Sequence, residues 1–218
     1  MPLSVVPLPN GQFAENCYLV YHPDAPETIL IDPGEEAERF LAAATEAGRR
    51  ISGIWLTHAH LDHVLGVGRI QEATGAPIYL HPADRALYEE VPEQGALFGL
   101  RAEPQPAPQL ELRHGQRLAL GDVPVEVRHV PGHSPGHVCF VAPGMVFCGD
   151  VVFAGSIGRT DLPGGDFATL IAGIQRELLT LPDDTVLYPG HGPATTVGQE
   201  RATNPFLRPS VAGRFRPA

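Results

Sequence analysis

Thr57-His58-Ala59-His60-Leu61-Asp62-His63 is the most informative segment of this 218-residue chain. It follows a short apolar run that predicts a strand, and it holds three imidazoles and one carboxylate. Side chains two residues apart on an extended backbone point the same way, so His58 and His60 face one space. The adjacent Asp62-His63 pair turns a second set of donors toward it. Zinc prefers imidazole nitrogen and carboxylate oxygen, so the segment predicts a metal site at a strand end.

Three further polar residues each follow a predicted strand within a glycine-rich turn. His133 lies in Pro131-Gly132-His133-Ser134-Pro135-Gly136-His137, Asp150 follows Gly149, and His191 lies in Pro189-Gly190-His191-Gly192. Loops at strand ends commonly carry functional side chains, and glycine lets their backbones pack closely. A single His or Asp in a turn is more often a hydrogen-bonding cap. Together with the first segment, however, these residues complete a donor set sufficient for two metal ions.

One motif in the same region is excluded as a catalytic site. Gly132-His133-Ser134-Pro135-Gly136 has the letters of the G-x-S-x-G nucleophile elbow of serine hydrolases. That elbow requires the backbone N–H of the residue after the serine, and Pro135 has none. No helical pattern follows it either, so Ser134 is not predicted to be a nucleophile.

The charge composition excludes several classes of function. The chain has 15 basic residues, all of them Arg, and 25 acidic residues, for a formal net charge of −10. Without Lys it can form neither a phosphate-loop lysine nor a Schiff base. The acidic balance argues against binding nucleic acid. No apolar run approaches the roughly 18 residues of a membrane-spanning helix, so we expect no membrane partner.

The other Cys and His residues are expected to be structural. Cys17, Cys139 and Cys148 lie in apolar runs and predict buried free thiols, which together with the absence of a signal-peptide pattern favours the cytoplasm. Asp32 is expected to be an outer hydrogen-bond partner of a metal-bound His. The remaining imidazoles are expected to fall into two groups, exposed turn residues (His22 and His114) and hydrogen-bonding residues (His81, His129 and His137).

The hydrophobic pattern predicts an α/β protein with sheets packed face to face and helices outside. Strands come in runs and helices follow them in both halves of the chain, with a hairpin turning at Gly121-Asp122. Residues 91–109 are rich in Pro and predict a long surface loop. The expected strands are 3–8, 17–21, 28–31, 53–57, 78–80, 118–120, 123–130, 138–141, 145–148 and 185–188, and the expected helices are 35–47, 64–73, 82–90, the segment after Asp166, and 196–202.

The series His58-x-His60-x-Asp62-His63, His133, Asp150 and His191 resembles the ligand series of the metallo-β-lactamase superfamily. Gly158-Arg159-Thr160-Asp161, the turn around His191 and Asn204-Pro205 are similar to glyoxalase II-like hydrolases (hydroxyacylglutathione hydrolases) and to the related persulfide dioxygenases. The resemblance implies a four-layer αββα sandwich. Glyoxalase II carries a further helical domain after its last ligand. The stretch after His191 is too short for one, so we expect the short form, a single domain over residues 1–218.

The resemblance also implies a set of ligands and a reaction. One divalent ion would be held by His58, His60 and His133, and a second by Asp62, His63 and His191, with Asp150 bridging them. Asp62 and Asp150 would be the catalytic carboxylates beside a metal-bridging hydroxide that attacks a small-molecule thioester of the S-lactoylglutathione type. Zinc is the expected metal, although iron and manganese accept the same ligands.

Substrate binding and the type of reaction stay open at this point. Arg159 and Asp161 are candidates for shaping the substrate pocket, but Arg159 could equally anchor a loop through an ion pair. A homo-oligomer is compatible with the sequence. The first alternative is a persulfide dioxygenase with one iron held by His58, His133 and Asp150. A nucleic-acid hydrolase and a zinc-stabilised binding module fit less well, the first because of the net charge and the second because structural zinc sites are closed.

Overall fold

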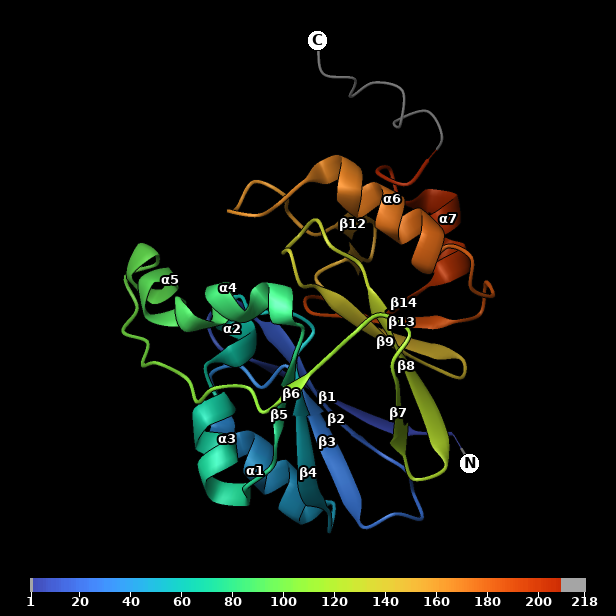
Figure 1. The fold of residues 1–218 in the computed structure, drawn as a ribbon. Coiled ribbons are helices and arrows are strands. Elements are labelled where there is room, and N and C mark those ends of the chain that lie inside the picture. Colours follow the sequence, from blue (N-terminus) through green and yellow to red (C-terminus); the bar gives the residue numbers. More distant parts are fainter. Residues whose placement is uncertain (1, 209–218) are drawn as a thin grey trace.

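The chain forms two six-stranded β-sheets with helices on both outer faces, and a small separate two-stranded sheet (Figure 1). The computed structural model describes residues 2–208. The first half contains β1 (Ser4–Asn10), β2 (Glu15–Tyr21), β3 (Glu27–Ile31), α1 (Ala37–Glu46), β4 (Arg50–Trp55), α2 (Leu61–Val64), α3 (Val67–Thr74), β5 (Ile78–Leu80), the 3-10 helix η1 (Pro82–Asp84), α4 (Arg85–Glu89), α5 (Val91–Leu97) and β6 (Leu110–Glu111). The second half contains β7 (Arg117–Leu120), β8 (Val123–His129), β9 (Val138–Ala142), β10 (Met145–Gly149), β11 (Val152–Phe153), β12 (Ser156–Ile157), α6 (Phe167–Glu177), β13 (Val186–Pro189), β14 (Thr195–Thr196) and α7 (Val197–Thr203).

Each half of the chain builds one six-stranded sheet. The strand order is β1-β2-β3-β4-β5-β6 in the first and β14-β13-β10-β9-β8-β7 in the second. In the first sheet β3, β4 and β5 run parallel, and in the second β10 and β13 do. Strand β8 runs in the same direction as β10, because both pair antiparallel with β9. The carboxyl ends of β8, β10 and β13 therefore lie at one edge of the second sheet.

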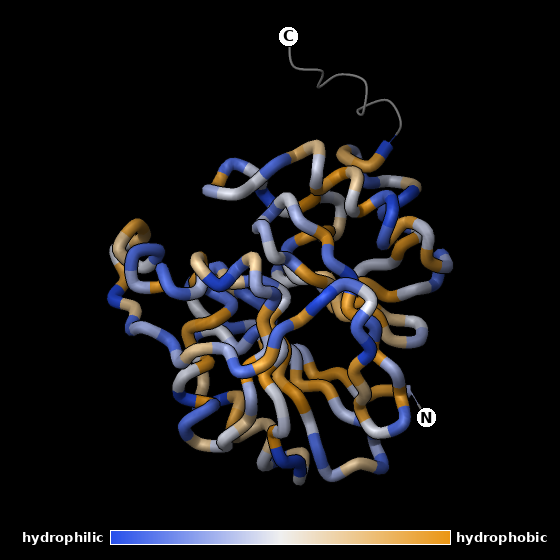
Figure 2. The backbone as a smooth tube through the Cα atoms, viewed as in Figure 1, coloured by the Kyte–Doolittle hydropathy of each residue, from blue (hydrophilic) through white to orange (hydrophobic). Residues whose placement is uncertain are grey.

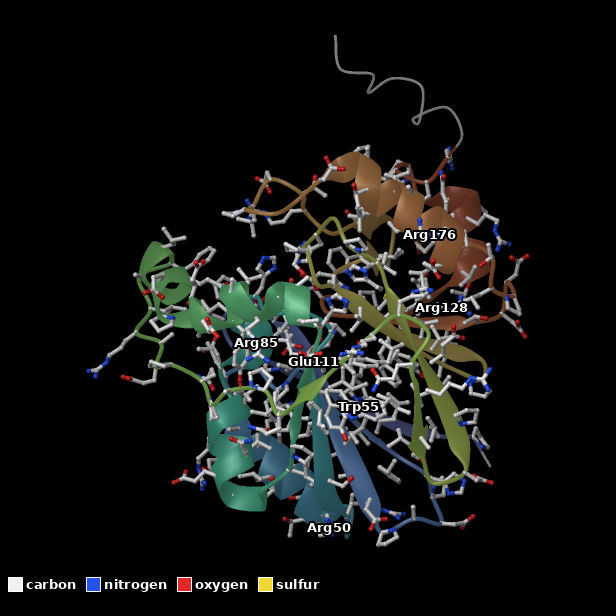
Figure 3. All side chains as sticks on the ribbon, in the orientation of Figure 1. Arg50, Trp55, Arg85, Glu111, Arg128 and Arg176 are labelled. Atoms are coloured by element: carbon white, nitrogen blue, oxygen red, sulfur yellow. The ribbon has the colours of Figure 1, made fainter. Side chains whose placement is uncertain are left out.

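Apolar side chains cover both faces of the strands. In β2, Cys17 and Leu19 pack with the layer of α1 and α3, whereas Tyr18 and Val20 pack between the sheets. This alternation follows from the two-residue period of a strand. Trp55 contributes to the layer between the sheets, with its ring 5.1 Å from that of Phe140 (Figure 3). Hydrophobic positions accordingly follow the central strands in Figure 2.

The outer face of the second sheet is covered by α6 and α7. Leu170 and Ile174 of α6 are fully buried against Val146 and Cys148 of β10. The side chain of Asp166 caps the start of α6 by accepting a hydrogen bond from the Thr169 N–H. Together with α1 and α3 on the first sheet, these helices complete the predicted four-layer αββα sandwich, which is confirmed.

Two expectations from the sequence are wrong. Residues 91–109 are not a loop throughout, because α5 occupies Val91–Leu97, with Pro92 in its first turn, where its missing N–H costs nothing. His22 is buried rather than exposed, since it packs against Gly121 of the β7–β8 hairpin and its Nε2 lies 3.2 Å from Asp122.

Other expectations are confirmed. The hairpin turn falls at Gly121-Asp122, and all three Cys residues are buried free thiols. Within residues 2–208, no helix is long and apolar enough to cross a membrane. The expected single domain includes residues 1 and 209–218, which lie outside the described residues.

Candidate metal centre

Seven His and Asp side chains meet at one edge of the sandwich. His58 and His60 follow β4, and Asp62 and His63 lie in the short helix α2. The remaining three side chains are His133, Asp150 and His191, which follow β8, β10 and β13. The two sheets are tied together at this edge, because the N–H of Val138 donates to the carbonyl of Thr57 at 2.8 Å. The structure therefore brings together all the ligand candidates identified from the sequence.

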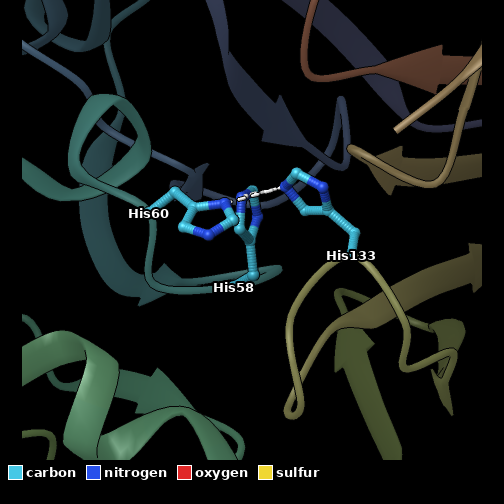
Figure 4. Close-up of side chains that lie close together, drawn as sticks. All are labelled: His58, His60 and His133. Carbon is cyan, nitrogen blue, oxygen red and sulfur yellow. Dashed lines mark hydrogen bonds between the residues drawn. The ribbon is translucent and has the colours of Figure 1, made fainter. Parts of the chain in front are cut away.

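The first group consists of His58, His60 and His133, which are all buried (Figure 4). Nε2 of His133 lies 2.8 Å from Nδ1 of His60 and 3.2 Å from Nε2 of His58. Three ring nitrogens this close to one another all point at one position. That arrangement suits three nitrogen ligands of a single ion.

The second group consists of Asp62, His63 and His191, with Asp150 between the two groups. Oδ2 of Asp62 lies 3.1 Å from Nε2 of His191 and 3.8 Å from Nε2 of His63. Oδ1 of Asp150 lies 3.4 Å from Nε2 of His63, while its Oδ2 lies 3.5 Å from Nε2 of His133 and 3.6 Å from Nε2 of His191. Asp150 thus faces both groups.

Four of the five imidazoles have an oxygen partner for the ring nitrogen that faces away from the centre. Nδ1 of His63 donates to Oδ2 of Asp32 at 3.1 Å, as expected, and Nδ1 of His58 donates to Oγ1 of Thr57 at 3.0 Å. The other two acceptors are backbone carbonyls, that of Arg159 for His133 at 2.8 Å and that of Phe13 for His191 at 3.1 Å. These bonds fix the tautomer in which Nε2 presents its lone pair to the centre.

Asp32 connects two of these imidazoles, because it bonds His63 directly and His58 through the hydroxyl of Thr57. It also accepts the Thr57 hydroxyl at 2.6 Å and the Thr57 N–H at 2.7 Å, so both of its oxygens are occupied by hydrogen bonds. Its φ of +52° lies in the left-handed region, which Asp tolerates better than most residues. Although Asp32 lies close to His58 and His63, these bonds make it a hydrogen-bond partner of the imidazoles rather than a ligand.

Burial and charge set the protonation of the centre. Burial, together with neighbouring imidazoles, holds the pKa of His58 well below its ordinary value and lowers that of His60 to about 3. Burial also opposes a charge on His63, but Asp150 and Asp62 outweigh it and raise its pKa. The attraction of His63 in turn lowers the pKa of Asp150 against the effect of burial. The centre therefore combines two imidazoles held neutral, His58 and His60, with ionised carboxylates and with His63, whose protonated form these carboxylates favour.

Two buried atoms of the centre have no hydrogen-bond partner among the described residues, Nε2 of His63 and Oδ1 of Asp150. Buried polar atoms are rarely left without a partner, and these two face each other across the centre. A divalent cation would satisfy both, so the residues present fit a metal centre. The backbone at Gly190 packs directly against this pair, because a Cβ there would clash with Oδ1 of Asp150 and the ring of His63.

Two residues that the sequence did not single out hold the ligand loops. The buried Asp84 accepts hydrogen bonds from the Ala59 N–H at 3.1 Å, the Ser134 hydroxyl at 2.7 Å and the Gly136 N–H. The amide of Gln94 accepts from the Leu61 N–H at 2.9 Å and donates to the Ala59 carbonyl at 3.0 Å. Asp84 follows Pro82 and resembles an ordinary helix cap in sequence, and Gln94 lies in the stretch expected to be a loop, so neither carried a usable signal.

The other imidazoles make structural contacts, as expected. His137 is fully buried, and its Nε2 accepts the Asp150 N–H at 3.0 Å. His81 stacks on His129 with ring centroids 4.1 Å apart, and Nε2 of His129 donates to the Pro135 carbonyl at 2.9 Å. His114 is exposed.

A cleft of about 380 Å³ opens onto the centre. Its polar lining includes His60, Asp62, His133, Asp150 and His191, whereas most of the remaining wall is apolar and aromatic. Arg159 also lines the cleft, and its guanidinium forms two hydrogen bonds with the carboxylate of Asp161, at 2.7 and 2.8 Å. Arg159 thus lies on the cleft and also pairs with Asp161, which is not among the lining residues, and a role of either side chain in substrate binding stays a prediction.

Comparison with known proteins agrees with this arrangement. The family model for the metallo-β-lactamase superfamily matches residues 10–191. The hydroxyacylglutathione hydrolase GloC of Haemophilus influenzae is 39% identical over 211 residues, which cover 95% of this chain and 98% of that protein. The solved structure of TTHA1623 in a di-iron-bound form is similar with a TM-score of 0.87 and 47% identity, covering 93% of this chain and 100% of that chain. The B3 metallo-β-lactamase BLEG-1 is similar with a TM-score of 0.88 and 36% identity, covering 94% and 99% of the two chains.

Proposed function

Because this chain belongs to the metallo-β-lactamase superfamily, whose fold binds divalent metals, we propose that it is a dinuclear hydrolase of thioesters of the hydroxyacylglutathione type. The observation that carries the proposal is the position of Asp150, whose oxygens lie 3.4–3.6 Å from imidazole nitrogens of both groups. His58, His60 and His133 would hold one ion. Asp62, His63 and His191 would hold the other, with Asp150 shared between them.

The chain's own residues prepare the centre for hydrolysis. The outer hydrogen bonds of the imidazoles orient the rings that would hold the ions, and the carboxylates of Asp62 and Asp150 would offset much of the ions' charge. Two divalent ions, when bound, supply a nucleophile by lowering the pKa of water and polarise the carbonyl that is attacked. Ser134 is not available as a nucleophile, because its hydroxyl donates to Asp84.

A thioester suits this site because a thiolate leaves readily and needs little protonation. Arg159 would face an anionic group of the thiol carrier, and its two hydrogen bonds to Asp161 would fix the orientation of the guanidinium. The net charge of −10 favours such a small substrate over nucleic acid. We propose zinc as the metal. Iron and manganese accept the same nitrogen and oxygen ligands, and TTHA1623 holds two irons.

The test is hydrolysis of S-lactoylglutathione by the protein loaded with zinc, iron or manganese, with the metal content measured in parallel. We expect thioester cleavage with two ions per chain, and a loss of about 100-fold or more in kcat for Asp150→Asn. Asp122→Asn is the matched control, because that carboxylate is 83% exposed and remote from the cleft lining. Failure to cleave this or any related acyl thioester would overturn the proposal. A single iron per chain, with oxygen uptake on glutathione persulfide, would instead indicate a persulfide dioxygenase.

A further inference from the structure

Two aromatic side chains in contact with each other form part of the apolar cleft wall. The rings of Phe13 and Phe98 meet edge to face, with centroids 5.3 Å apart and an angle of 78°, and both line the cleft. Phe98 is 49% exposed, although it is one of the largest apolar side chains. An exposed aromatic surface beside a polar reaction centre is typical of a site that binds an apolar group. We call this pair the aromatic clamp.

Phe98 is held in place relative to the metal centre. It directly follows α5, which stands out from the sandwich beside α2 and α4 (Figure 1). Gln94 of α5 fixes the helix to the ligand loop through its hydrogen bonds with Ala59 and Leu61, two residues that alternate with the ligands His58, His60 and Asp62. The position of Phe98 is thus set by the same loop that carries the first ligands.

The backbone of Phe13 contacts the second group of the centre. Its carbonyl accepts the hydrogen bond from Nδ1 of His191 at 3.1 Å, so the backbone that carries the ring also orients a member of the second group. The aromatic clamp therefore adjoins the group formed by Asp62, His63 and His191.

Arg159, the cationic residue of the cleft lining, contacts the first group through its backbone. The Arg159 carbonyl accepts from Nδ1 of His133 at 2.8 Å, and the Arg159 guanidinium lies on the cleft wall. Among the described residues that line the cleft, Arg159 is the only Arg. A substrate whose carbonyl lies between the two groups would therefore meet a cation on one side and the aromatic clamp on the other.

This asymmetry assigns an orientation to the substrate, in an inference that rests on the proposed thioesterase function. We propose that the aromatic clamp binds the acyl group of the thioester, while Arg159 faces the anionic thiol carrier, and that the preferred acyl group is apolar. Ring-to-ring contact and burial of apolar surface favour an aryl group over a small hydroxylated one. The enzyme thus selects among acyl groups through Phe13 and Phe98.

The test compares three thioesters: phenylacetyl-glutathione, lactoyl-glutathione and the lactoyl thioester of an uncharged alkyl thiol. We expect the wild type to have the highest kcat/KM for the phenylacetyl substrate. Phe98→Ala should lower that value about tenfold and change the two lactoyl values by no more than about twofold. Leu97→Ala is the matched control, because Leu97 is the adjacent residue, is 83% exposed and does not line the cleft.

Specific results of this substrate comparison would overturn the inference. Equal losses on all three substrates, with unchanged metal content, would overturn the aromatic clamp as a selective site. A selective loss on the alkyl thiol substrate would overturn the orientation, because it would place the thiol at the clamp. Phe13→Leu, which keeps the carbonyl that His191 uses, should also lower the phenylacetyl value, and no effect of either Phe variant would overturn the inference. A wild type that is active on none of the three overturns the proposed function itself.

Discussion

Replacing Asp84 should weaken both the fold and the metal centre, because this one carboxylate joins two ligand loops. It accepts three hydrogen bonds, from Ala59 between two ligands of the first loop and from Ser134 and Gly136 beside His133. Burial raises the pKa of Asp84, and the three donors counter that rise. The carboxylate is fully buried, so no water can replace it without rearrangement of the loops.

The magnitude follows from the donors left behind. Each buried donor that loses its acceptor costs about 1–2 kcal/mol, so losing all three in Asp84→Ala should lower the free energy of unfolding by about 3–6 kcal/mol. Ser134→Ala removes one of the three bonds and should cost about 1–2 kcal/mol. Because the freed loops carry His58, His60 and His133, the affinity for the first metal ion should fall about 10–100-fold in Asp84→Ala.

Denaturation in urea, followed by circular dichroism on metal-free protein, measures the first effect, and competition with a chelator measures the second. Asp84→Asn keeps the shape of the side chain, so it serves if Asp84→Ala does not fold, and it should fall between the alanine variant and the wild type. Asp184→Asn is the control, because this carboxylate is exposed and has no hydrogen-bond or ion-pair partner among the described residues. An Asp84→Ala protein with the denaturation midpoint and metal affinity of the wild type would refute the reasoning.

Three further changes test other parts of the site. Gly190→Ala places a Cβ in clash with Oδ1 of Asp150, so it should abolish metal-dependent activity, and full activity in a steady-state assay would contradict the geometry. Asp62→Ala removes the only carboxylate of the second group and should reduce the metal content, measured by mass spectrometry, from two ions to one per chain. Burial, and then the stacked His129, lower the pKa of His81 from 6.5 to about 4. Between these values the unfolded chain binds more protons than the folded chain, so stability should fall as the pH drops from 6.5 to 4, by about 1–2 kcal/mol after allowance for partial exposure. His81→Gln should flatten this part of the stability curve, and an unchanged slope would exclude His81 as its source.

The strand ends explain why so much of the site could be predicted from the sequence. His133, Asp150 and His191 each follow an apolar run and lie in a glycine-rich turn. The strands that precede them run in the same direction within one sheet, so the polar residues after them share an edge. An apolar run followed by a polar residue in a glycine-rich turn is a local pattern. Because it occurs three times, it predicts that these three distant residues meet at one edge of the sheet. The hairpin at Gly121-Asp122 was predictable for the same reason, because its turn and its alternation are both local.

What escaped prediction depends on contacts between distant segments. His22 is buried only because the β7–β8 hairpin packs Gly121 against its ring, a contact across 99 positions that neither segment signals alone. The role of Asp84 arises from donors on two separate loops. Helix α5 was missed because Pro92 predicts irregular structure, whereas at the first turn of a helix proline is well tolerated.

Two residues of the cleft wall contribute a backbone carbonyl to the metal centre and a side chain to the cleft surface. Phe13 and Arg159 each orient a ligand imidazole through a backbone carbonyl and face the cleft with a side chain. A substitution at either position changes the surface that the substrate meets but keeps the carbonyl that holds His191 or His133. The substrate preference can therefore change without loss of the metal centre. A substitution of Asp32 or Asp84 would instead disturb the metal centre, because there the side chain itself makes the hydrogen bonds that position the ligands. Substrate-specificity variants of this protein should consequently be sought at Phe13, Phe98 and Arg159.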